Sequence, residues 1–396
     1  MKICLIVDDY VPASKKSAAK AMHDLAVEFT LQGHLVTVVT PNQRTKGRND
    51  IFILDGVTVC EFDAGETKSA SSSTRLVNET LFSPRAWLAF RSYFKNHQHD
   101  LIIYHSPSIF WGILVFYLKR LWMARSYLIL RDLFPQWVID QGIISSASPI
   151  TFYLRVFEFI NYSSADFIGL QSPKNMAWFS AANLSSKPVE VLFNWAKTES
   201  IAIGADTYRT SLGLQNKVVF FYGGNMGPAQ DMFNIVVLAK RMLLYENAYF
   251  LLVGSGSEVE MIKKLVNEDQ ISNLLLLPPV DQDDYKKMLA EFDVGLFCLH
   301  RSHTTHNFPG KLLGYMNQAK PILGCVNPEN DLKQLIESAN AGYISISGES
   351  DDLFINAVKL LNDSELRCNI GRNGQRLLTD VFSVRKASEQ ILKRFI

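Results

Sequence analysis

Short apolar runs of strand length alternate with longer windows of helical period along most of the chain. The runs are rich in β-branched and aliphatic residues, and windows such as Ser17 to Leu31 and Asp231 to Leu244 separate them. This order predicts parallel sheets with helices on both faces, because a helix is the usual crossover between parallel strands. The predicted strands are residues 2–7, 35–40, 101–105, 127–131, 167–171, 218–223, 249–254, 274–278, 294–299 and 321–326.

The pattern occurs in both halves of the chain, and the halves join near residues 192–205. We therefore predict an α/β fold with two doubly wound, Rossmann-like domains that face each other across a cleft. Residues 1–198 are expected to form the first domain and 199–380 the second, with 381–396 as a helix that packs back on the first. Residues 64–75, AGETKSASSSTR, are predicted to form a surface loop.

The composition is that of an ordinary water-soluble protein, with 47% hydrophobic and 20% charged residues. The longest apolar run, residues 109–118, has about half the length that a bilayer-spanning helix needs. No signal-peptide core develops at the amino terminus. The five cysteines lie far apart without a C-x-x-C pair, which predicts neither a disulfide framework nor a thiolate metal site. A cytoplasmic protein is therefore expected.

A basic, aromatic segment lies between residues 85 and 125. Its only acid is Asp100, and the segment is rich in Trp, Phe and Tyr. Such a surface suits anionic lipid headgroups, although the same aromatics can form the core of two helices with solvated cations outside. Nucleic acid is not expected as a partner, because the net charge is only +1 and no nucleic-acid-binding module occurs. The cations are Arg85, Arg91, Lys95, Lys119, Arg120 and Arg125.

Glycine-rich turns follow two predicted strands in the second half. FYGGNMGPAQD contains Gly223, Gly224 and Gly227, and VGSGSEVE contains Gly254 and Gly256. Neither turn completes a dinucleotide or P-loop fingerprint, since the third glycine of the first motif and the Lys-Ser/Thr pair of the second are missing. Both turns nevertheless expose backbone N–H groups that can hold phosphate oxygens. The alternative is that each glycine only permits a tight turn.

The segment NFPGKLLGYMNQAKP, residues 307–321, begins like a helix and places a cation in the first turn. Pro309 and Gly310 start the helix, and Lys311 follows them. A cation there opposes the helix dipole by about 0.3–1 kcal/mol, a cost that a bound anion removes. We therefore predict a diphosphate held by Lys311 and the glycine turns. The alternative is a solvent-facing lysine whose stem covers apolar surface.

Polar residues also close predicted strands in the first half. His105 in YHSPS, and Arg131 and Asp132 in RDLFP, are candidates to contact a sugar or an acceptor, or else are turn formers. Glu158 is either a helix-surface residue or a site residue. The D-x-D spacing at 281–283 precedes a helical window and is better explained as a helix cap. His300, His303 and His306 lack a cysteine or carboxylate partner, so no metal site is predicted there.

Several of these segments, read together with GHLVTVVTP and PGKLLGYMNQAKPILG, resemble glycosyltransferase family 4, which has the GT-B fold. Within the family they are most similar to WbuB-type N-acetyl-L-fucosamine transferases of O-antigen and capsule assembly. The resemblance implies that a sugar moves from a UDP-sugar to a lipid-linked, polyprenyl-diphosphate saccharide with retention of anomeric configuration and without a metal. It also implies a protein peripherally associated with the inner face of the cytoplasmic membrane.

The resemblance and the strand-end residues together give a predicted site. The first domain is expected to bind the acceptor and the second the nucleotide-sugar. The predicted catalytic residues are His105, Asp132 and Lys311, and Ser14 and Arg131 are expected on the acceptor side. The predicted donor-binding residues are Gly223, Gly224, Asn225, Gly227, Gly254, Gly256, Glu258, Val280, His306, Pro309, Gly310, Lys311 and Gly314.

The sequence departs from the broad family pattern at two positions. Glutamates eight residues apart in the family correspond here to His306 and Gly314. Glu258, on the second glycine turn, is then a candidate to bind the ribose, and Gly314 suggests that something packs close to its backbone. Two other functions stay open: a UDP-sugar epimerase of the same architecture, and a non-catalytic nucleotide-sugar-binding component of a polysaccharide assembly complex.

Overall fold

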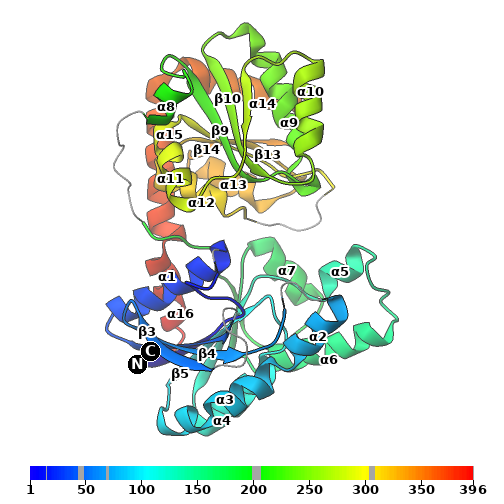
Figure 1. The fold of residues 1–396 in the computed structure, drawn as a ribbon, viewed down its shortest axis with the longest axis vertical. Helices are drawn as coiled ribbons and strands as arrows, with labels where there is room; N and C mark the ends of the chain where they lie inside the picture. Colours follow the sequence, from blue (N-terminus) through cyan, green and yellow to red (C-terminus); the bar gives the residue numbers. More distant parts are fainter. Residues whose placement is uncertain (15, 43–48, 68–70, 199–206, 303–307, 396) are drawn as a thin grey trace. The chain divides into compact units, whose positions relative to one another are not determined.

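The computed structural model describes the chain except for residues 15, 43–48, 68–70, 199–206, 303–307 and 396. Contacts divide it into two compact units. The first unit contains Met1–Trp195 together with Val384–Ile396, and the second contains Ala196–Ser383. Each unit is built on one sheet that helices cover on both faces (Figure 1).

Eight strands form the sheet of the first unit within the described residues, in the order β3-β4-β2-β1-β5-β6-β7-β8. Neighbouring strands are parallel except for β3 and β4, which pair antiparallel. The strands are β1 (Lys2–Ile6), β2 (Leu35–Asn42), β3 (Asp50–Leu54), β4 (Val57–Asp63), β5 (Leu101–Ser106), β6 (Arg125–Leu130), β7 (Phe167–Leu170) and β8 (Val189–Val191).

Helices α1 and α16 pack on one face of this sheet, and α3 and α4 pack on the other. The side-chain amide of Gln32, just after α1, donates a hydrogen bond to Ser388 Oγ of α16 at 2.7 Å. The helices are α1 (Ser17–Leu31), α2 (Ser72–Thr80), α3 (Phe82–Asn96), α4 (Gly112–Trp122), α5 (Gln136–Asp140), α6 (Pro149–Ser163), α7 (Pro173–Ala181) and α16 (Val384–Leu392).

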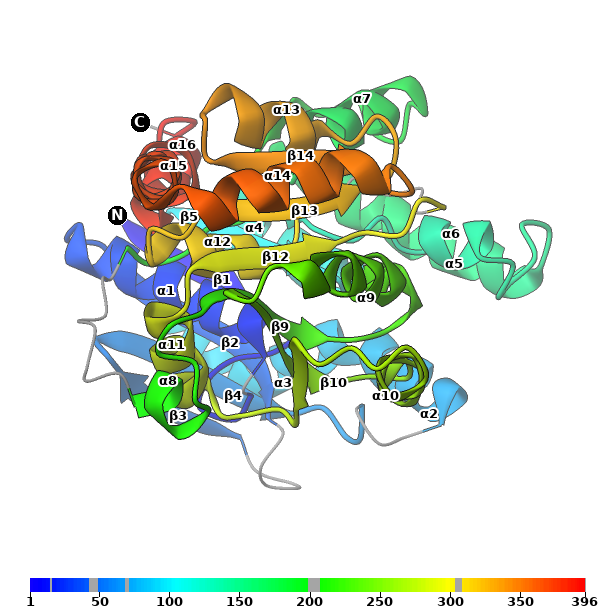
Figure 2. The same ribbon diagram turned by 90° about the horizontal axis from the view of Figure 1, so that it is seen from above.

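The sheet of the second unit has six parallel strands within the described residues, in the order β11-β10-β9-β12-β13-β14 (Figure 2). Helices α9, α10 and α14 cover one face. Its strands are β9 (Val218–Asn225), β10 (Ala248–Ser255), β11 (Leu274–Leu277), β12 (Val294–Cys298), β13 (Ile322–Val326) and β14 (Gly342–Ile346). The helices are α8 (Thr207–Ser211), α9 (Met232–Arg241), α10 (Val259–Glu268), α11 (Gln282–Glu291), α12 (Lys311–Asn317), α13 (Asp331–Ser338), α14 (Ser350–Asn362) and α15 (Ser364–Leu377), with short turns η1 (Pro228–Gln230), η2 (Met242–Leu244) and η3 (Leu378–Phe382).

The predicted fold class is confirmed, since both units are doubly wound, Rossmann-like sheets. The sequence analysis missed strands β3, β4, β8 and β14. It was also wrong about residues 72–75, which begin α2 after Ser71 caps the helix by accepting from Thr74 N–H. No helix in the part of the chain that the structure describes is long and apolar enough to cross a membrane.

A close crossing of two helices sets the position of α4 in the first unit. A Cβ added to Gly112, the first residue of α4, would lie 2.6 Å from the Cα of Asn161 in α6. Backbone atoms of α6 therefore occupy the space that any side chain at position 112 needs. Trp111, which precedes this contact, is fully buried in the core beside α3.

We predict that Gly112→Ala destabilises the protein although alanine favours helices more than glycine does. The added methyl group overlaps the α6 backbone, and overpacking of this kind costs about 1–3 kcal/mol. Gly310→Ala is the control, because no atom lies within 4 Å of a Cβ at that position. Thermal unfolding followed by circular dichroism should show a lower midpoint for Gly112→Ala alone, and equal midpoints for both variants would contradict the prediction.

Candidate active site

The two glycine turns of the second unit lie against each other. Strands β9 and β10 are parallel neighbours, and their register pairs Gly224 with Gly254. A Cβ at Gly254 would lie 1.9 Å from the Gly224 carbonyl oxygen, and a Cβ at Gly256 would lie 2.2 Å from that of Met226. Both glycines also have φ near +158°, a conformation that other residues rarely adopt. The contact between the turns therefore requires glycine at these positions.

Lys311 reaches the first of these turns from the start of α12. Its Nζ lies 3.5 Å from the centroid of the Tyr222 ring, and 3.6 Å from where a Cβ on Gly224 would stand. Burial lowers the pKa of the Lys311 ammonium to about 7, an effect that nearby Cys298 opposes. Among the described residues, Lys311 has no carboxylate ion pair. The ammonium thus lies beside exposed backbone without a carboxylate partner among the described residues, and its burial argues against the solvent-facing alternative.

Glu258 ends the second turn and precedes α10. Its backbone N–H donates to the Met226 carbonyl at 3.0 Å, which joins it to the first turn. Its carboxylate oxygen Oε2 is buried and has no hydrogen-bond partner among the described residues. The negative charge of Glu258 contributes to raising the pKa of the Tyr222 phenol, an effect that burial dominates. The structure therefore brings Glu258, Tyr222 and Lys311 to the same end of the sheet.

The other predicted donor residues have different surroundings. Gly223 faces the Tyr285 ring, whose Cε2 would lie 2.2 Å from an added Cβ. The Tyr285 ring therefore fills the space where a side chain at position 223 would lie. The side chain of Asn225 donates to Gln230 Oε1 at 2.7 Å beside Gly227. Val280, after β11, is 38% exposed. His306 lies outside the described residues.

The start of α12 is exposed. Among the described residues, no atom lies within 4 Å of a Cβ added to Gly310, and Pro309 is partly buried. At Gly314 an added Cβ would meet only Leu289, at 3.4 Å. The expectation that a group packs tightly against the Gly314 backbone is therefore not met by any described protein atom.

In the first unit, the predicted residues lie at the carboxyl edge of the sheet. His105 is the penultimate residue of β5, and Arg131 and Asp132 follow β6. Burial, with a smaller effect of Arg131, lowers the pKa of the His105 imidazole to about 3, so the ring is neutral. Arg131 donates to the carbonyls of Leu192 and Phe193 at 2.7 and 3.1 Å and is fixed there, whereas Asp132 is exposed.

Ser14 is buried in the turn after β1, where its hydroxyl accepts a hydrogen bond from the Lys16 N–H at 3.3 Å. The structure thus groups His105 with Arg131 in the first unit and Lys311 with the glycine turns in the second. The three predicted catalytic residues are divided between the units, with His105 and Asp132 in one and Lys311 in the other.

The sequence analysis missed Asp8, which follows β1. Its carboxylate accepts hydrogen bonds from the indole N–H of Trp111 and from the backbone N–H of Ser108. Burial raises the pKa of this carboxyl to about 8, with smaller contributions from the charges of Glu79 and Asp9. The signal in the sequence was the acidic pair VDD directly after the first predicted strand.

Two other expectations have clear outcomes. The helix-cap interpretation of the D-x-D spacing is confirmed, because Asp281 accepts hydrogen bonds from the N–H groups of Asp283 and Asp284 at the start of α11. The surface interpretation of Glu158 is wrong. Glu158 is only 4% exposed and accepts hydrogen bonds from Arg155 and Tyr162 inside the first unit.

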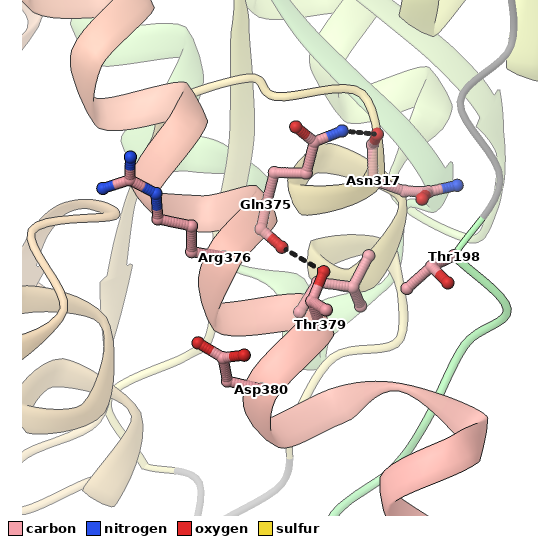
Figure 3. Close-up of a pocket in the computed structure, with 7 residues that line it drawn as sticks. Thr198, Asn317, Gln375, Arg376, Thr379 and Asp380 are labelled. Atoms are coloured by element: carbon pink, nitrogen blue, oxygen red, sulfur yellow. Dashed lines mark hydrogen bonds between the residues drawn. The ribbon is translucent and has the colours of Figure 1, made fainter.

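A separate cavity of about 330 Å³ lies in the second unit beside the end of α12 and the junction of α15 with η3 (Figure 3). Gln375 Nε2 donates to the Asn317 carbonyl at 3.5 Å, and Thr379 Oγ1 donates to the Gln375 carbonyl at 3.0 Å. No predicted site residue lines this cavity, so it is distinct from the Lys311 cluster. Its lining residues are Thr198, Asn317, Gln375, Arg376, Leu378, Thr379 and Asp380.

Comparisons with known proteins agree with this architecture. Residues 205–377 match the family model described as glycosyl transferases group 1. A probable glycosyltransferase, WbjE of Pseudomonas aeruginosa, is 26% identical over 54% of this chain and 54% of its own length. A putative colanic acid biosynthesis glycosyl transferase, WcaI of Escherichia coli strain K12, is 22% identical over 66% of this chain and 65% of its own. The matches thus span about half to two thirds of these relatives.

Among solved structures, HepE of Anabaena in complex with UDP superposes with a TM-score of 0.70 at 15% identity, covering 100% of this chain and 99% of that one. The likeness at this identity establishes the fold, and the family match covers most of the second unit. The protein therefore has the GT-B fold, and residues 205–377, within its second unit, match the model of the group 1 glycosyl transferases.

Proposed function

We propose that the protein is a retaining glycosyltransferase that moves a sugar from a UDP-sugar to a lipid-linked, polyprenyl-diphosphate saccharide in O-antigen or capsular polysaccharide assembly. The observation that carries the proposal is the position of Lys311, whose ammonium lies beside the glycine turns and has no carboxylate partner in the part of the chain that the structure describes. A nucleoside diphosphate matches this combination of one cation and exposed amides. The relatives WbjE and WcaI and the UDP complex of HepE support the same reaction class.

The proposed reaction mainly requires that the leaving nucleoside diphosphate be stabilised. The bond between the anomeric carbon and the diphosphate oxygen breaks, the acceptor oxygen bonds to that carbon, and the acceptor proton passes to the departing diphosphate. Lys311 and the turn amides neutralise charge that grows on the diphosphate in the transition state. Because these groups supply the positive charge, the proposed mechanism needs no metal ion.

The donor sugar in this proposal is N-acetyl-L-fucosamine. This choice rests on the resemblance to WbuB-type transferases.

The neutral imidazole of His105 is suited to bind a sugar hydroxyl, since it can donate one hydrogen bond and accept another. Asp132, exposed at the end of β6, is the second polar group of this edge. Both belong to the unit to which the proposal assigns the acceptor.

An assay with UDP-sugars, with and without a synthetic undecyl-diphosphate N-acetylglucosamine acceptor, tests the function. Acceptor-dependent release of UDP and a disaccharide product support transfer. Interconversion of the UDP-sugar without acceptor would instead identify an epimerase. Retained UDP binding without turnover would identify a non-catalytic binding component. The anomeric configuration of the product, read by NMR, decides whether the reaction retains or inverts.

We predict that Lys311→Met weakens binding of UDP-glucose by about 10- to 100-fold, the effect of losing one charge-assisted hydrogen bond. In the wild type, binding favours the ammonium form of Lys311, whose pKa is about 7 in the free protein. The affinity should therefore fall, and proton uptake should appear, as pH rises from 7 to 8.5. Isothermal titration calorimetry in buffers of different ionisation enthalpy measures both.

The control for this experiment is Lys287→Met, since Lys287 is an exposed lysine of α11. It should bind UDP-glucose with the wild-type affinity and the wild-type pH dependence. An unchanged affinity in Lys311→Met, or a pH dependence that survives in that variant, would contradict the role of Lys311.

We predict that Glu258→Gln weakens UDP by about tenfold and leaves 2′,3′-dideoxy-UDP nearly unaffected. The unpartnered carboxylate oxygen of Glu258 is expected to accept from the ribose hydroxyls, and an amide is the weaker acceptor. Glu260→Gln is the matched control, because Glu260 is exposed on the same helix and pairs with Lys263. Equal losses for the two nucleotides in a double-mutant cycle would rule out the ribose contact.

We propose further that the surface of α3 and α4 docks on an anionic membrane. The two helices contain no acidic residue. The rings of Trp87 in α3 and Tyr117 in α4 pack together, with their centroids 5.6 Å apart. The core interpretation holds for Phe90, Phe94 and Trp122, which are buried. The exposed residues, here called the α3–α4 surface, are Leu88, Arg91, Lys95, Phe116, Tyr117, Arg120 and Met123.

The other cations of the basic segment are engaged within the protein. Lys119 forms an ion pair with Asp166 at 2.9 Å, and Arg125 pairs with the same carboxylate at 3.4 Å. Arg85 donates to the Ala64 carbonyl and to Asn78. Lys119 is therefore a poor choice for testing a membrane contact, and Arg91, Lys95 and Arg120 are the better set.

We predict that the triple variant R91E/K95E/R120E loses about 100-fold or more in affinity for vesicles that contain phosphatidylglycerol, because each cation near such a surface contributes about 1 kcal/mol. Vesicle co-sedimentation measures the loss, which should shrink at high salt. The control K240E/K263E/K264E makes the same change of net charge at exposed lysines of the second unit. Equal pelleting of both triple variants would exclude the α3–α4 surface as the docking site.

A further inference from the structure

Asp8 occupies a central place at the carboxyl edge of the first sheet. It follows β1, which lies between β2 and β5 in the strand order. Ligands of parallel α/β sheets bind at this edge. His105 at the end of β5 belongs to the same edge, so Asp8 stands where the proposal already expects the acceptor.

The carboxylate of Asp8 is held in one orientation. The indole N–H of Trp111 and the backbone N–H of Ser108 donate to it. Trp111 is fully buried and stacks on Phe82 with ring centroids 5.1 Å apart, so this donor cannot move aside. Asp8 itself is only partly buried, which leaves it within reach of a ligand. A fixed and reachable acceptor group is what recognition of a hydroxyl requires.

Ser106 ends the neighbouring strand β5, and its hydroxyl lacks a partner among the described residues. The register of β1 and β5 pairs Ile6 with Tyr104, and extended two residues past the end of β1 it would set Asp8 opposite Ser106. Ser106 is fully buried, and its Oγ has no hydrogen-bond partner among the described residues. Because Ser106 is fully buried, its hydroxyl lies behind the ligand edge, and Asp8 is the more accessible polar group there.

The charges around Asp8 select the kind of ligand. Glu79 from α2 and the adjacent Asp9 are the charged groups that act on it, and both raise the pKa of its carboxyl, which burial brings to about 8. Glu79 pairs with Arg75 at 2.7 Å, and Asp9 lies 3.4 Å from Lys16. Among the described residues, no cation pairs with the Asp8 carboxyl itself, so this position suits a neutral ligand rich in hydroxyl groups better than a phosphate.

We propose that Asp8 touches the acceptor sugar and accepts a hydrogen bond from the hydroxyl to which the donor sugar is transferred. The inference rests on the proposed glycosyl transfer and adds a substrate-binding residue to it. Asp8 orients the hydroxyl, and the proton of that hydroxyl still leaves with the diphosphate. The ionised carboxylate is the form that binds, because charged acceptors make the stronger hydrogen bonds.

The first experiment compares Asp8→Asn with Asp9→Asn at pH 9, where Asp8 is ionised in the wild type. The acceptor is undecyl-diphosphate N-acetylglucosamine, and the donors are a panel of UDP-hexoses, UDP-N-acetylhexosamines and UDP-N-acetyl-L-fucosamine. Asp8→Asn should lower kcat/KM for the acceptor by about 10- to 100-fold and leave the affinity for UDP unchanged. Asp9→Asn, which carries the same change one residue away, should keep the wild-type acceptor KM.

A pH profile separates binding from a merely structural role. With saturating donor, kcat/KM for the acceptor should rise as pH increases through about 8, because Asp8 ionises there. Glu79→Gln removes a negative neighbour, so the rise should move to lower pH in that variant. The rise should be absent in Asp8→Asn. If Asp8 had only a structural role, the pH dependence of kcat/KM for the acceptor would be the same in folded Glu79→Gln as in the wild type.

Saturation-transfer NMR with methyl glycosides of glucose, galactose and N-acetylglucosamine gives a readout that does not depend on turnover. Binding to the wild type and to Asp9→Asn but not to folded Asp8→Asn supports the inference. Equal binding to Asp8→Asn, or an unchanged acceptor kcat/KM in that variant, overturns it, as does a wild type that binds no glycoside. A wild type that binds glycosides without transferring sugar would refute the proposed function. In that case, the difference in glycoside binding between the wild type and Asp8→Asn would still show whether Asp8 contacts a sugar.

Discussion

The candidate site depends on the contact between two backbone turns. Gly254 and Gly256 allow the turn after β10 to lie directly against the turn after β9, where any side chain would overlap a carbonyl oxygen. This contact presents backbone of both turns at one end of the sheet and leaves room for Lys311 over Tyr222. Burial without a carboxylate partner disfavours the charged form of Lys311, and this lowers the pKa of its ammonium to about 7. An anionic ligand would remove this effect.

The carboxyl edges of the two sheets differ in charge. In the second unit, Lys311 and the glycine turns favour an anion. In the first unit, Asp8 and a neutral His105 favour hydroxyl groups. The proposed reaction needs both kinds of recognition, since a diphosphate must be stabilised as it leaves and a sugar hydroxyl must be oriented to attack. The same fold thus supports different ligands through a few side chains at strand ends.

Local patterns were enough for most strands, including the edge strand β11, but not for β3, β4, β8 and β14. The sequence ILDGVTV contains the Asp-Gly turn of a β-hairpin, and Asp55 and Gly56 both have positive φ between β3 and β4. A hairpin of this kind does not fit the alternation of strands and helices that the rest of the sequence predicts. Strand β8 has only three residues, too few for a recognisable pattern. Helix α2 lies in a polar stretch without a clear helical pattern. The structure shows that the Ser71 side chain caps it.

The two doubly wound sheets and the chemical types at their strand ends could be predicted from the sequence, because hydrophobic periodicity and glycine turns act over a few neighbouring residues. Tertiary packing set the environment of each group. It placed the Lys311 ammonium over Tyr222, paired Lys119 with Asp166, and raised the pKa of Asp8 through burial and nearby acids. It also left a Glu258 oxygen without a hydrogen-bond partner among the residues that the structure describes. Burial and charge at a residue depend on segments far away in the chain, which no local pattern contains.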